Sequence, residues 1–284
     1  MAVVLLENVG RTYGAFTAVE GVDLAVNKGE FLTFLGPSGC GKTTTLRMIA
    51  GLERNTSGRV MIEDTVVSDP AANWFVPPER RQLGMVFQSY AIWPHMTVFE
   101  NIAYPLRIRR MAKAEVTRRV NDVLDLIEMR HLADRPAPDL SGGQQQRVAI
   151  ARALVFEPSV LLLDEPLSNL DAKLRTQMGE EFRKLQQRLG ITTLYVTHDQ
   201  DEAMALSDRI VVMQSGNVLQ IGSPQQIYHR PENLAVAQFV GSPNVLGARV
   251  QSSADADGLY RLNVQGDGWN GTALSSRSYG PGEG

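Results

Sequence analysis

The 284 residues are 43% hydrophobic, which is enough for one large domain with a sizeable core and a smaller second domain. The formal net charge of -3 gives no general attraction to nucleic acid or anionic lipid, although local basic sites stay open, and no nucleic-acid partner is expected. The single cysteine, Cys40, excludes an internal disulfide, and no apolar run approaches the roughly 18 residues of a membrane span. The first residues, MAVVLLENVG, have no basic lead, so they predict a first strand of a cytoplasmic protein and not a signal peptide.

Four short apolar runs predict strands that are covered on both faces. They are EFLTFLG (30–36), LGMVFQ (83–88), SVLLLDE (159–165) and TTLYVTH (192–198). Each run ends in a small or polar residue, and ligands of open parallel sheets bind outside the carboxyl ends of the strands. One cleft is therefore expected to be lined by Gly36, Gln88, Asp164, Glu165 and His198.

Helical patterns alternate with these strands. They are KTTTLRMIAGL after the first run, EVTRRVNDVLDLIEM (115–129), QQQRVAIARALV after residue 143, and AKLRTQMGEEFRKLQQRLG (172–190). The last pattern ends at Gly190, a typical helix stop. No strand is expected between about 89 and 157, so this stretch predicts a helical insertion with its own surface.

After about residue 240, short alternating segments are separated by Gly, Ser and Asp. GARVQSS, GLYRLNVQG and WNGTALSS predict strands of β-hairpins, and the final YGPGEG predicts a turn. Three short strands are marginal by themselves, so an incomplete small β domain is expected here.

GPSGCGKT (36–43) matches G-x-x-x-x-G-K-[ST] between a predicted strand and a predicted helix, the context that this phosphate-binding loop requires. Its glycines let backbone N–H groups converge on phosphate oxygens. A helix N-terminus supplies only about half a unit of charge, and Lys42 adds a full one. Thr43 is expected to hold Mg²⁺. The alternative is a plain glycine-rich turn, which the flanking strand and helix disfavour.

Two carboxylates follow the strand in VLLLDEP. Asp164 is expected to bind Mg²⁺, directly or through water, and Glu165 to orient and deprotonate an attacking water. The alternative is an ordinary acidic turn before Pro166, which is disfavoured behind a phosphate loop.

Three further residues have structural alternatives. His198, at the end of the last predicted strand, is either a satisfied structural histidine or a cleft residue, and its register with the other strand ends favours the cleft. Gln88 is either strand-end polarity or a side chain that reaches metal and water. Tyr13, in ENVGRTYG, is a core aromatic by default or stacks on an adenine ring.

LSGGQ (140–144) begins another predicted helix. Ser141 is a good N-cap, and the two glycines expose the helix start to an anion, whereas capping alone would need only the serine. The stretch lies in the helical insertion, away from the phosphate loop in sequence. We therefore expect it to serve a nucleotide held by a second copy, because a two-fold dimer sets each surface against its complement.

Together these motifs resemble the ATP-binding cassette (ABC) ATPases over about residues 3–240. The resemblance implies an α/β P-loop NTPase fold whose ATPase domain spans 1–238 and whose helical subdomain spans about 89–157. It also implies a C-terminal β domain of the oligonucleotide/oligosaccharide-binding type, β-barrel-like and here incomplete, at 239–284. ATP and Mg²⁺ are the implied ligands.

The resemblance also implies three sets of site residues. The catalytic set is Lys42, Gln88, Glu165 and His198. The nucleotide-binding set is Tyr13, the Walker A residues Gly36, Pro37, Ser38, Gly39, Cys40, Gly41, Lys42, Thr43 and Thr44, the signature residues Ser141, Gly142, Gly143 and Gln144, and Asp171 of the D-loop SNLD (168–171). The metal set is Thr43, Gln88 and Asp164. In this family Tyr13 would stack on adenine, Gln88 would sense the transmembrane partner, and His198 would be the switch histidine.

FQSYAIWPHMTVFENIAYPL (87–106) and FVGSPNVL (239–246) resemble the maltose, polyamine and ferric-iron importer group. This implies a homodimer on the inner face of the cell membrane, a permease that docks near Gln88–His95, and indirectly an extracytoplasmic solute-binding protein. Tyr90, Ile92 and Trp93 form an apolar cluster in that stretch, which is either a docking surface or core.

Other classes carry the same signature. DNA-maintenance ATPases have long heptad helices or cysteine-rich zinc inserts, and translation-associated ABC proteins usually hold two cassettes; neither pattern is in this sequence. Glu165 and His198 together favour an ATPase over a regulatory ATP binder. The solute stays open among sugars, polyamines and ferric iron, because other chains select it.

Overall fold

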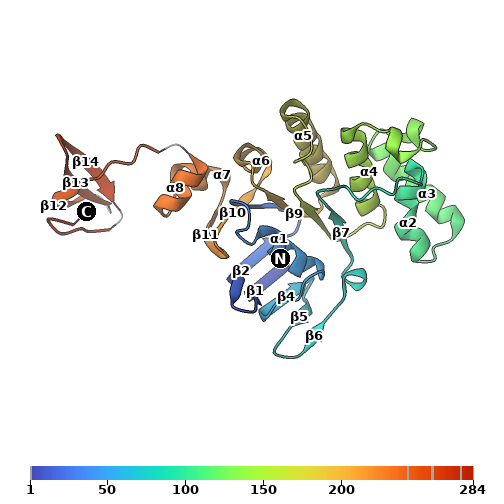
Figure 1. The fold of residues 1–284 in the computed structure, drawn as a ribbon, viewed down its shortest axis with the longest axis horizontal. Helices are drawn as coiled ribbons and strands as arrows, with labels where there is room; N and C mark the ends of the chain where they lie inside the picture. Colours follow the sequence, from blue (N-terminus) through green and yellow to red (C-terminus); the bar gives the residue numbers. More distant parts are fainter. Residues whose placement is uncertain (1, 242, 257–258, 276, 284) are drawn as a thin grey trace. The chain divides into compact units, whose positions relative to one another are not determined.

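The computed structural model describes residues 2–241, 243–256, 259–275 and 277–283, which form two compact units, Met1–Val240 and Gly241–Gly284 (Figure 1). The first unit contains a six-stranded sheet in the order β11-β10-β3-β9-β8-β7. Its strands are β3 (Phe31–Leu35), β7 (Leu83–Val86), β8 (Val160–Asp164), β9 (Thr192–Thr197), β10 (Arg209–Gln214) and β11 (Asn217–Gly222). Neighbours are parallel except β10 and β11.

The four strands predicted from consecutive apolar residues are confirmed as β3, β7, β8 and β9. Every residue of β3, β8 and β9 is buried, because packed elements cover both faces of the sheet. The expectation that His198 ends the last strand is wrong, since β10 follows and pairs with β3. The apolar run Ile210–Met213 carried that signal, but so short a run does not distinguish a strand from a buried helical turn.

A second, antiparallel sheet has the order β2-β1-β4-β5-β6. Its strands are β1 (Ala2–Tyr13), β2 (Phe16–Asn27), β4 (Ser57–Ile62), β5 (Thr65–Asp69) and β6 (Trp74–Phe75). The predicted first strand is confirmed as β1, and the rest of this sheet was not predicted.

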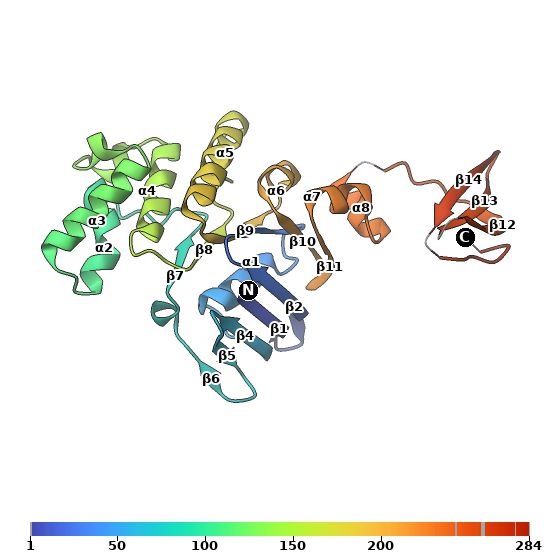
Figure 2. The same cartoon turned by 180° about the vertical axis from the view of Figure 1, so that it is seen from behind.

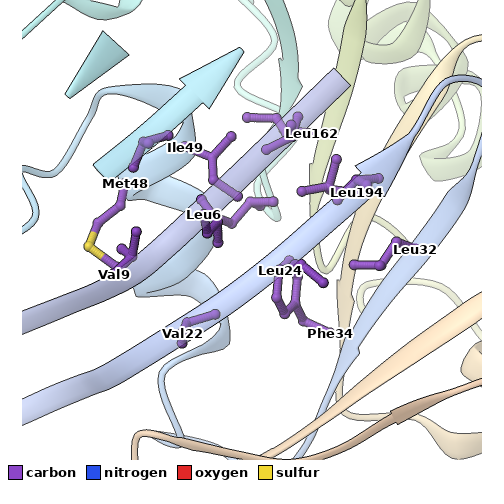
Figure 3. Packing of buried hydrophobic residues seen from close by; sticks show 14 of the residues in the cluster. Leu6, Val9, Val22, Leu24, Leu32, Phe34, Met48, Ile49, Leu162 and Leu194 are labelled. Carbon is purple, nitrogen blue, oxygen red and sulfur yellow. The ribbon is translucent and has the colours of Figure 1, made fainter. Parts of the chain in front are cut away.

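Helix α1 (Lys42–Ala50) packs between the two sheets. Figure 3 shows Met48 and Ile49 of this helix against Leu6 and neighbouring side chains from both sheets. Met48 and Ile49 are almost completely buried. The helix that follows the phosphate loop is therefore held from two sides, which fixes the position of the loop.

Three helices form a separate group beside β7 (Figure 2). They are α2 (Val98–Ile108), α3 (Lys113–Leu126) and α4 (Gly142–Leu154), and a core that includes Ile102, Val120 and Val148 joins them. Residues 89–157 are all described and contain no strand, as predicted. The α2 start has a capping box, in which Thr97 and Glu100 satisfy each other's backbone N–H groups.

The other helices cover the six-stranded sheet or follow it. They are α5 (Ala172–Leu189), α6 (Gln200–Leu206), α7 (Pro224–His229) and α8 (Leu234–Val240), with 3₁₀ turns η1 (Pro78–Arg80), η2 (Arg130–Leu132) and η3 (Ala137–Asp139). α5 ends at Gly190, whose φ of 61° is the left-handed conformation expected of a glycine stop.

The second unit contains an antiparallel sheet of β12 (Arg249–Ala256), β13 (Leu259–Gly266) and β14 (Trp269–Ser275). The predicted hairpin strands are thus confirmed, while Gly258, Ser276 and Gly284 of the predicted segments lie outside the described residues. The turn after Gly280 pairs with β12 through hydrogen bonds of Val250 with Gly282 and Glu283. The described strands form an open sheet with small buried contributions from Val250 and Leu262.

Arg81 closes the far end of α1. Its guanidinium donates to the carbonyls of Met48 and Ile49, at 2.8 Å each, and to those of Val67 and Val76. Only 3% of Arg81 is exposed, and burial lowers its pKa to about 10, so it stays charged at neutral pH. The Arg81 side chain thus donates hydrogen bonds to buried carbonyls at the C-terminal end of α1.

Arg81→Ala should lower the free energy of unfolding by about 3 kcal/mol, because the carbonyls of Ile49 and Val76 lose their donor, although those of Met48 and Val67 keep a backbone one. Urea unfolding of the purified chain measures this. The control is Arg80→Ala, which truncates the neighbouring, exposed arginine. It should change the free energy of unfolding by no more than about 0.5 kcal/mol. Equal effects of the two substitutions would contradict the role given to Arg81.

Candidate functional site

The phosphate loop spans Gly36 to Gly41, between β3 and α1. Gly41 is the N-cap of α1 with φ 105°, and a Cβ there would lie 2.7 Å from the carbonyl oxygen of Ala18. A Cβ on Gly36 would lie 2.2 Å from the carbonyl oxygen of Met213. Both positions therefore require glycine. Around Gly39, by contrast, a Cβ would meet no atom within 4 Å, so the loop is open on that side.

Lys42 is 4% exposed and folds along this loop. Its Nζ donates to the carbonyls of Gly36 and Pro37, at 2.7 and 2.9 Å. The first N–H groups of α1 have no partner within the helix, so they are free to bind an anion. An open loop with unpartnered backbone donors and one lysine fits a polyphosphate.

Thr43 and Asp164 bring α1 and β8 together. Thr43 Oγ1 donates to Asp164 Oδ1 at 2.9 Å, and Arg47 lies 3.8 Å from the other carboxylate oxygen. Burial raises the pKa of Asp164, while the hydrogen bond from Thr43 and the charge of Arg47 oppose that rise. Hydroxyl and carboxylate oxygens are ligands that Mg²⁺ prefers, so the pair fits this ion.

Gln88, Glu165 and His198 converge on one point. Glu165 Oε2 lies 3.4 Å from Gln88 Nε2, and its Oε1 lies 3.3 Å from His198 Nδ1. Glu165 has φ 47°, unusual for a residue with a side chain, and its backbone N–H donates to Val196. This turn at the end of β8 separates its carboxylate from that of Asp164.

An open cleft of about 590 Å³ contains part of this arrangement. It is lined by Arg47, Phe87, Gln88, Ser89, Ala91, Asp164 and Asn169. Asn169 donates to the backbone carbonyl of Gln88 at 2.8 Å, which ties the D-loop to the end of β7. Of the five residues predicted to line one cleft, Gln88 and Asp164 line this one, and Glu165 and His198 are connected to Gln88 by the contacts above, whereas Gly36 is not among the lining residues. Sequence reasoning did not single out Arg47 and Asn169, since nothing in their local pattern distinguishes them from other surface residues.

Tyr13 ends β1 and is 43% exposed, so it is not a core residue. The guanidinium of Arg11 lies 4.2 Å from the centre of its ring. The free face of an exposed aromatic ring is compatible with stacking on a base.

LSGGQ starts α4 as predicted, and Ser141 is its N-cap. Gln144 completes a capping box, because its backbone N–H donates to Ser141 Oγ and its side chain accepts from the Ser141 N–H. The expectation that capping needs only the serine is therefore wrong. Gly142 and Gly143 have no positive φ, and a Cβ on either would make contacts of 3.4 Å or longer. The fold of this chain thus does not by itself demand these two glycines.

Asp171 caps α5, with Leu174 N–H donating to its carboxylate at 3.0 Å. Ser168, in the same D-loop, donates to the carbonyl of Glu165 at 2.9 Å. Among the described residues that line the cleft above, none belongs to the signature stretch 140–144.

The stretch after Gln88 divides between core and surface. Tyr90 is 6% exposed and belongs to the core, whereas Ser89 and His95 are exposed. Trp93 is half-buried, with its ring 4.3 Å from that of Tyr104. Arg152 of α4 donates to the carbonyls of Tyr90 and Ala91 and lies over Trp93, which fixes this stretch to the helix that LSGGQ begins.

The model of the family described as ABC transporter matches residues 19–168, and the chain belongs to this family. A trehalose/maltose import ATP-binding protein (MalK) from Thermococcus litoralis is 53% identical over 270 residues, covering 94% of this chain and 73% of the relative. An Fe(3+) ions import ATP-binding protein (FbpC) from Agrobacterium fabrum is 49% identical, with 92% and 72% covered.

Solved structures of ABC ATPases share the fold of this chain. CbiO1 from Clostridium perfringens, part of the ABC transporter complex CbiONQ, has a TM-score of 0.72 at 28% identity, covering 81% of this chain and 92% of that one. A dimeric ATP-binding cassette, MJ0796, in a post-hydrolysis state with ADP and Pi, has a TM-score of 0.66 at 34% identity, with 78% and 98% covered. The chain is thus an ATPase that uses ATP with Mg²⁺.

Asp164→Asn should raise the midpoint of thermal unfolding at pH 7 by a few degrees, where about 1 kcal/mol corresponds to roughly 2–4 °C. Burial raises the pKa of Asp164, so its ionised form destabilises the folded state above that pKa. The gain should shrink as pH falls below the raised folded-state pKa and should vanish below the ordinary carboxyl pKa of about 4, where the side chain is neutral in both states.

Calorimetry over this pH range measures the difference. The same variant should lose Mg²⁺-dependent ATP hydrolysis and the stabilisation that MgATP gives the wild-type chain. Asp134→Asn, at an exposed position in a turn, is the control and should change neither property. A less stable Asp164→Asn would contradict this reading of the site.

Proposed function

We propose that this chain is the ATP-hydrolysing subunit of an ABC importer, with the site residues in the roles given below. The observation that carries the proposal is the convergence of Gln88 and His198 on Glu165, beside the Thr43–Asp164 pair. It supports one site in which a base lies next to a metal pair, and that pair joins the start of α1 to the end of β8.

In this proposal Lys42 and the N–H groups at the α1 start bind the β- and γ-phosphates. Thr43 and Asp164 would hold Mg²⁺, with Gln88 lining the same cleft as Asp164, and the ion would neutralise charge on the phosphate oxygens. Glu165 holds the attacking water and takes its proton, since its carboxylate is displaced from the metal pair. His198, 3.3 Å from Glu165 Oε1, orients that carboxylate.

The two signature glycines support a site shared between two copies. They are not required by the chain's own packing, while Ser141 and Gly142 are exposed at a helix start. A backbone free of side chains at that place suits the close approach of a phosphate from outside. In a head-to-tail dimer, LSGGQ of one copy and the phosphate loop of the other would enclose each ATP.

ATP should drive dimerisation of Glu165→Gln, in which turnover is blocked, and Ser141→Arg in the same background should abolish it. Light scattering or sedimentation with and without ATP measures this. Ser223→Arg is a matched control, because Ser223 caps α7 with the same kind of box, made with Gln226. Dimers that survive Ser141→Arg, or that are lost equally with Ser223→Arg, would contradict the shared site.

The importer assignment rests on the relatives, whose names describe import ATP-binding proteins for sugars, ferric iron, spermidine/putrescine and sn-glycerol-3-phosphate. No described helix is both long and apolar enough to span a bilayer. In our proposal the subunit works at the inner face of the membrane against a permease, which in turn meets an extracytoplasmic solute-binding protein. The solute is chosen by those partners.

The exposed residues that follow Gln88, up to His95, are the proposed docking surface; Ser89 and Ala91 also line the cleft, whereas Pro94 and His95 lie outside its lining. They adjoin Gln88 on one side and are fixed to α4 by Arg152 on the other, so the surface is connected to both the base and the signature helix. Tyr90 and Trp93 support this surface from beneath, because Tyr90 is buried in the core and Trp93 packs on Tyr104.

His95→Glu should reduce transport by the assembled complex at least tenfold while ATP hydrolysis by the free subunit changes less than about twofold, as expected for a contact outside the nucleotide cleft. Gln187→Arg, exposed on α5, is the control and should alter neither activity. Trp93→Ala is a poorer probe, because loss of its packing should also destabilise the subunit. Unchanged transport in His95→Glu would place the permease elsewhere.

A further inference from the structure

Residues 107–113 join α2 to α3 and are called here the basic turn. Within seven positions the sequence RIRRMAK carries four cations, Arg107, Arg109, Arg110 and Lys113, in a chain whose net charge is -3. All four are exposed, and within the described residues none of them forms an ion pair. Nearby arginines differ: Arg118 and Arg130 both pair with carboxylates.

Helix stability does not account for this group of charges. Cations favour the C-terminal end of a helix, which explains Arg107 in the last turn of α2. Lys113, however, is the first residue of α3, where the helix dipole disfavours a positive charge. Arg110 has φ 56°, a conformation that costs energy for a residue with a side chain.

An apolar side chain lies among these charges. Ile108, the last residue of α2, is 63% exposed, whereas Leu106, two residues earlier, packs in the helical core. The guanidinium of Arg109 lies 3.9 Å from the centre of the Phe156 ring, which holds one of the cations in place. The basic turn is thus a cationic surface in which one arginine packs on an aromatic ring and an aliphatic side chain is exposed.

We propose that the basic turn binds the anionic headgroups of a phospholipid bilayer, with Ile108 entering the interface between headgroups and acyl chains. This rests on the proposed function, which brings the subunit to the membrane. Phosphate-bearing headgroups complement four unpaired cations, and an interface takes up an exposed isoleucine that a nucleic-acid backbone would not. One such patch would bind the subunit to the bilayer weakly and reversibly, and this binding would add to the affinity of the subunit for the permease.

Sedimentation of the full chain with vesicles tests this without any permease. The wild-type chain should bind vesicles of phosphatidylcholine containing phosphatidylglycerol, should not bind phosphatidylcholine alone, and should be released by salt. A cation near an anionic bilayer raises partition by roughly fivefold, so the combined Arg107→Gln, Arg109→Gln, Arg110→Gln, Lys113→Gln variant should bind at least tenfold more weakly. Ile108→Gln should also weaken binding.

A control variant removes the same charge from other exposed cations, through Lys28→Gln, Lys184→Gln, Arg188→Gln and Arg230→Gln, and should keep the binding. The proposal would be overturned if the wild-type chain did not bind anionic vesicles at low salt. It would also be overturned if the basic-turn variant and the control variant lost vesicle binding equally. A basic-turn variant that keeps vesicle binding but no longer joins membranes containing the permease would overturn it too, because that result would assign the turn to a protein contact. ATP hydrolysis by each variant is measured in parallel, so a failure of the proposed ATPase site is recognised separately.

Discussion

The burial of α1 between two sheets is the constraint on which the site depends. Met48 and Ile49 fix the helix from both sides, and Arg81 satisfies its far end, so the phosphate loop at its start has one position. From that position Thr43 reaches Asp164 at the end of β8. The parallel strands then bring Gln88, Glu165 and His198 to the same edge, because β7, β8 and β9 end side by side.

A second constraint connects the cleft with the helical group. Arg152 lies on the helix that LSGGQ starts and holds the carbonyls of Tyr90 and Ala91, both with positive φ. Asn169 holds the carbonyl of Gln88 from the D-loop. Any displacement of α4 therefore moves the stretch next to Gln88, which gives the proposed nucleotide site at Ser141 a physical connection to the proposed docking surface.

The sequence was sufficient wherever a local pattern carries the information. Consecutive apolar residues predicted β3, β7, β8 and β9, and the polar residues at the ends of β7 and β8 predicted Gln88 and Asp164 as lining residues of the cleft. The alternation of apolar and polar residues in β2 is itself a strand signal. Strand β10 was not predicted, because a run of four apolar residues is compatible with both a strand and a buried helical turn. Arg47, Asn169 and Arg152 were beyond reach, since their partners are distant in sequence. Gln144 was misjudged although the spacing Ser-x-x-Gln is itself a capping signal.

The capping box at the α4 start has a consequence for how tightly two copies hold each other. Ser141 and Gln144 satisfy one another's backbone N–H groups, so in the proposed shared site a phosphate would find only the N–H groups of Gly142 and Gly143 without an acceptor among the described residues. A helix start with so few free donors would hold a phosphate weakly. In that proposal, the loss of the γ-phosphate on hydrolysis would be sufficient for the two copies to separate.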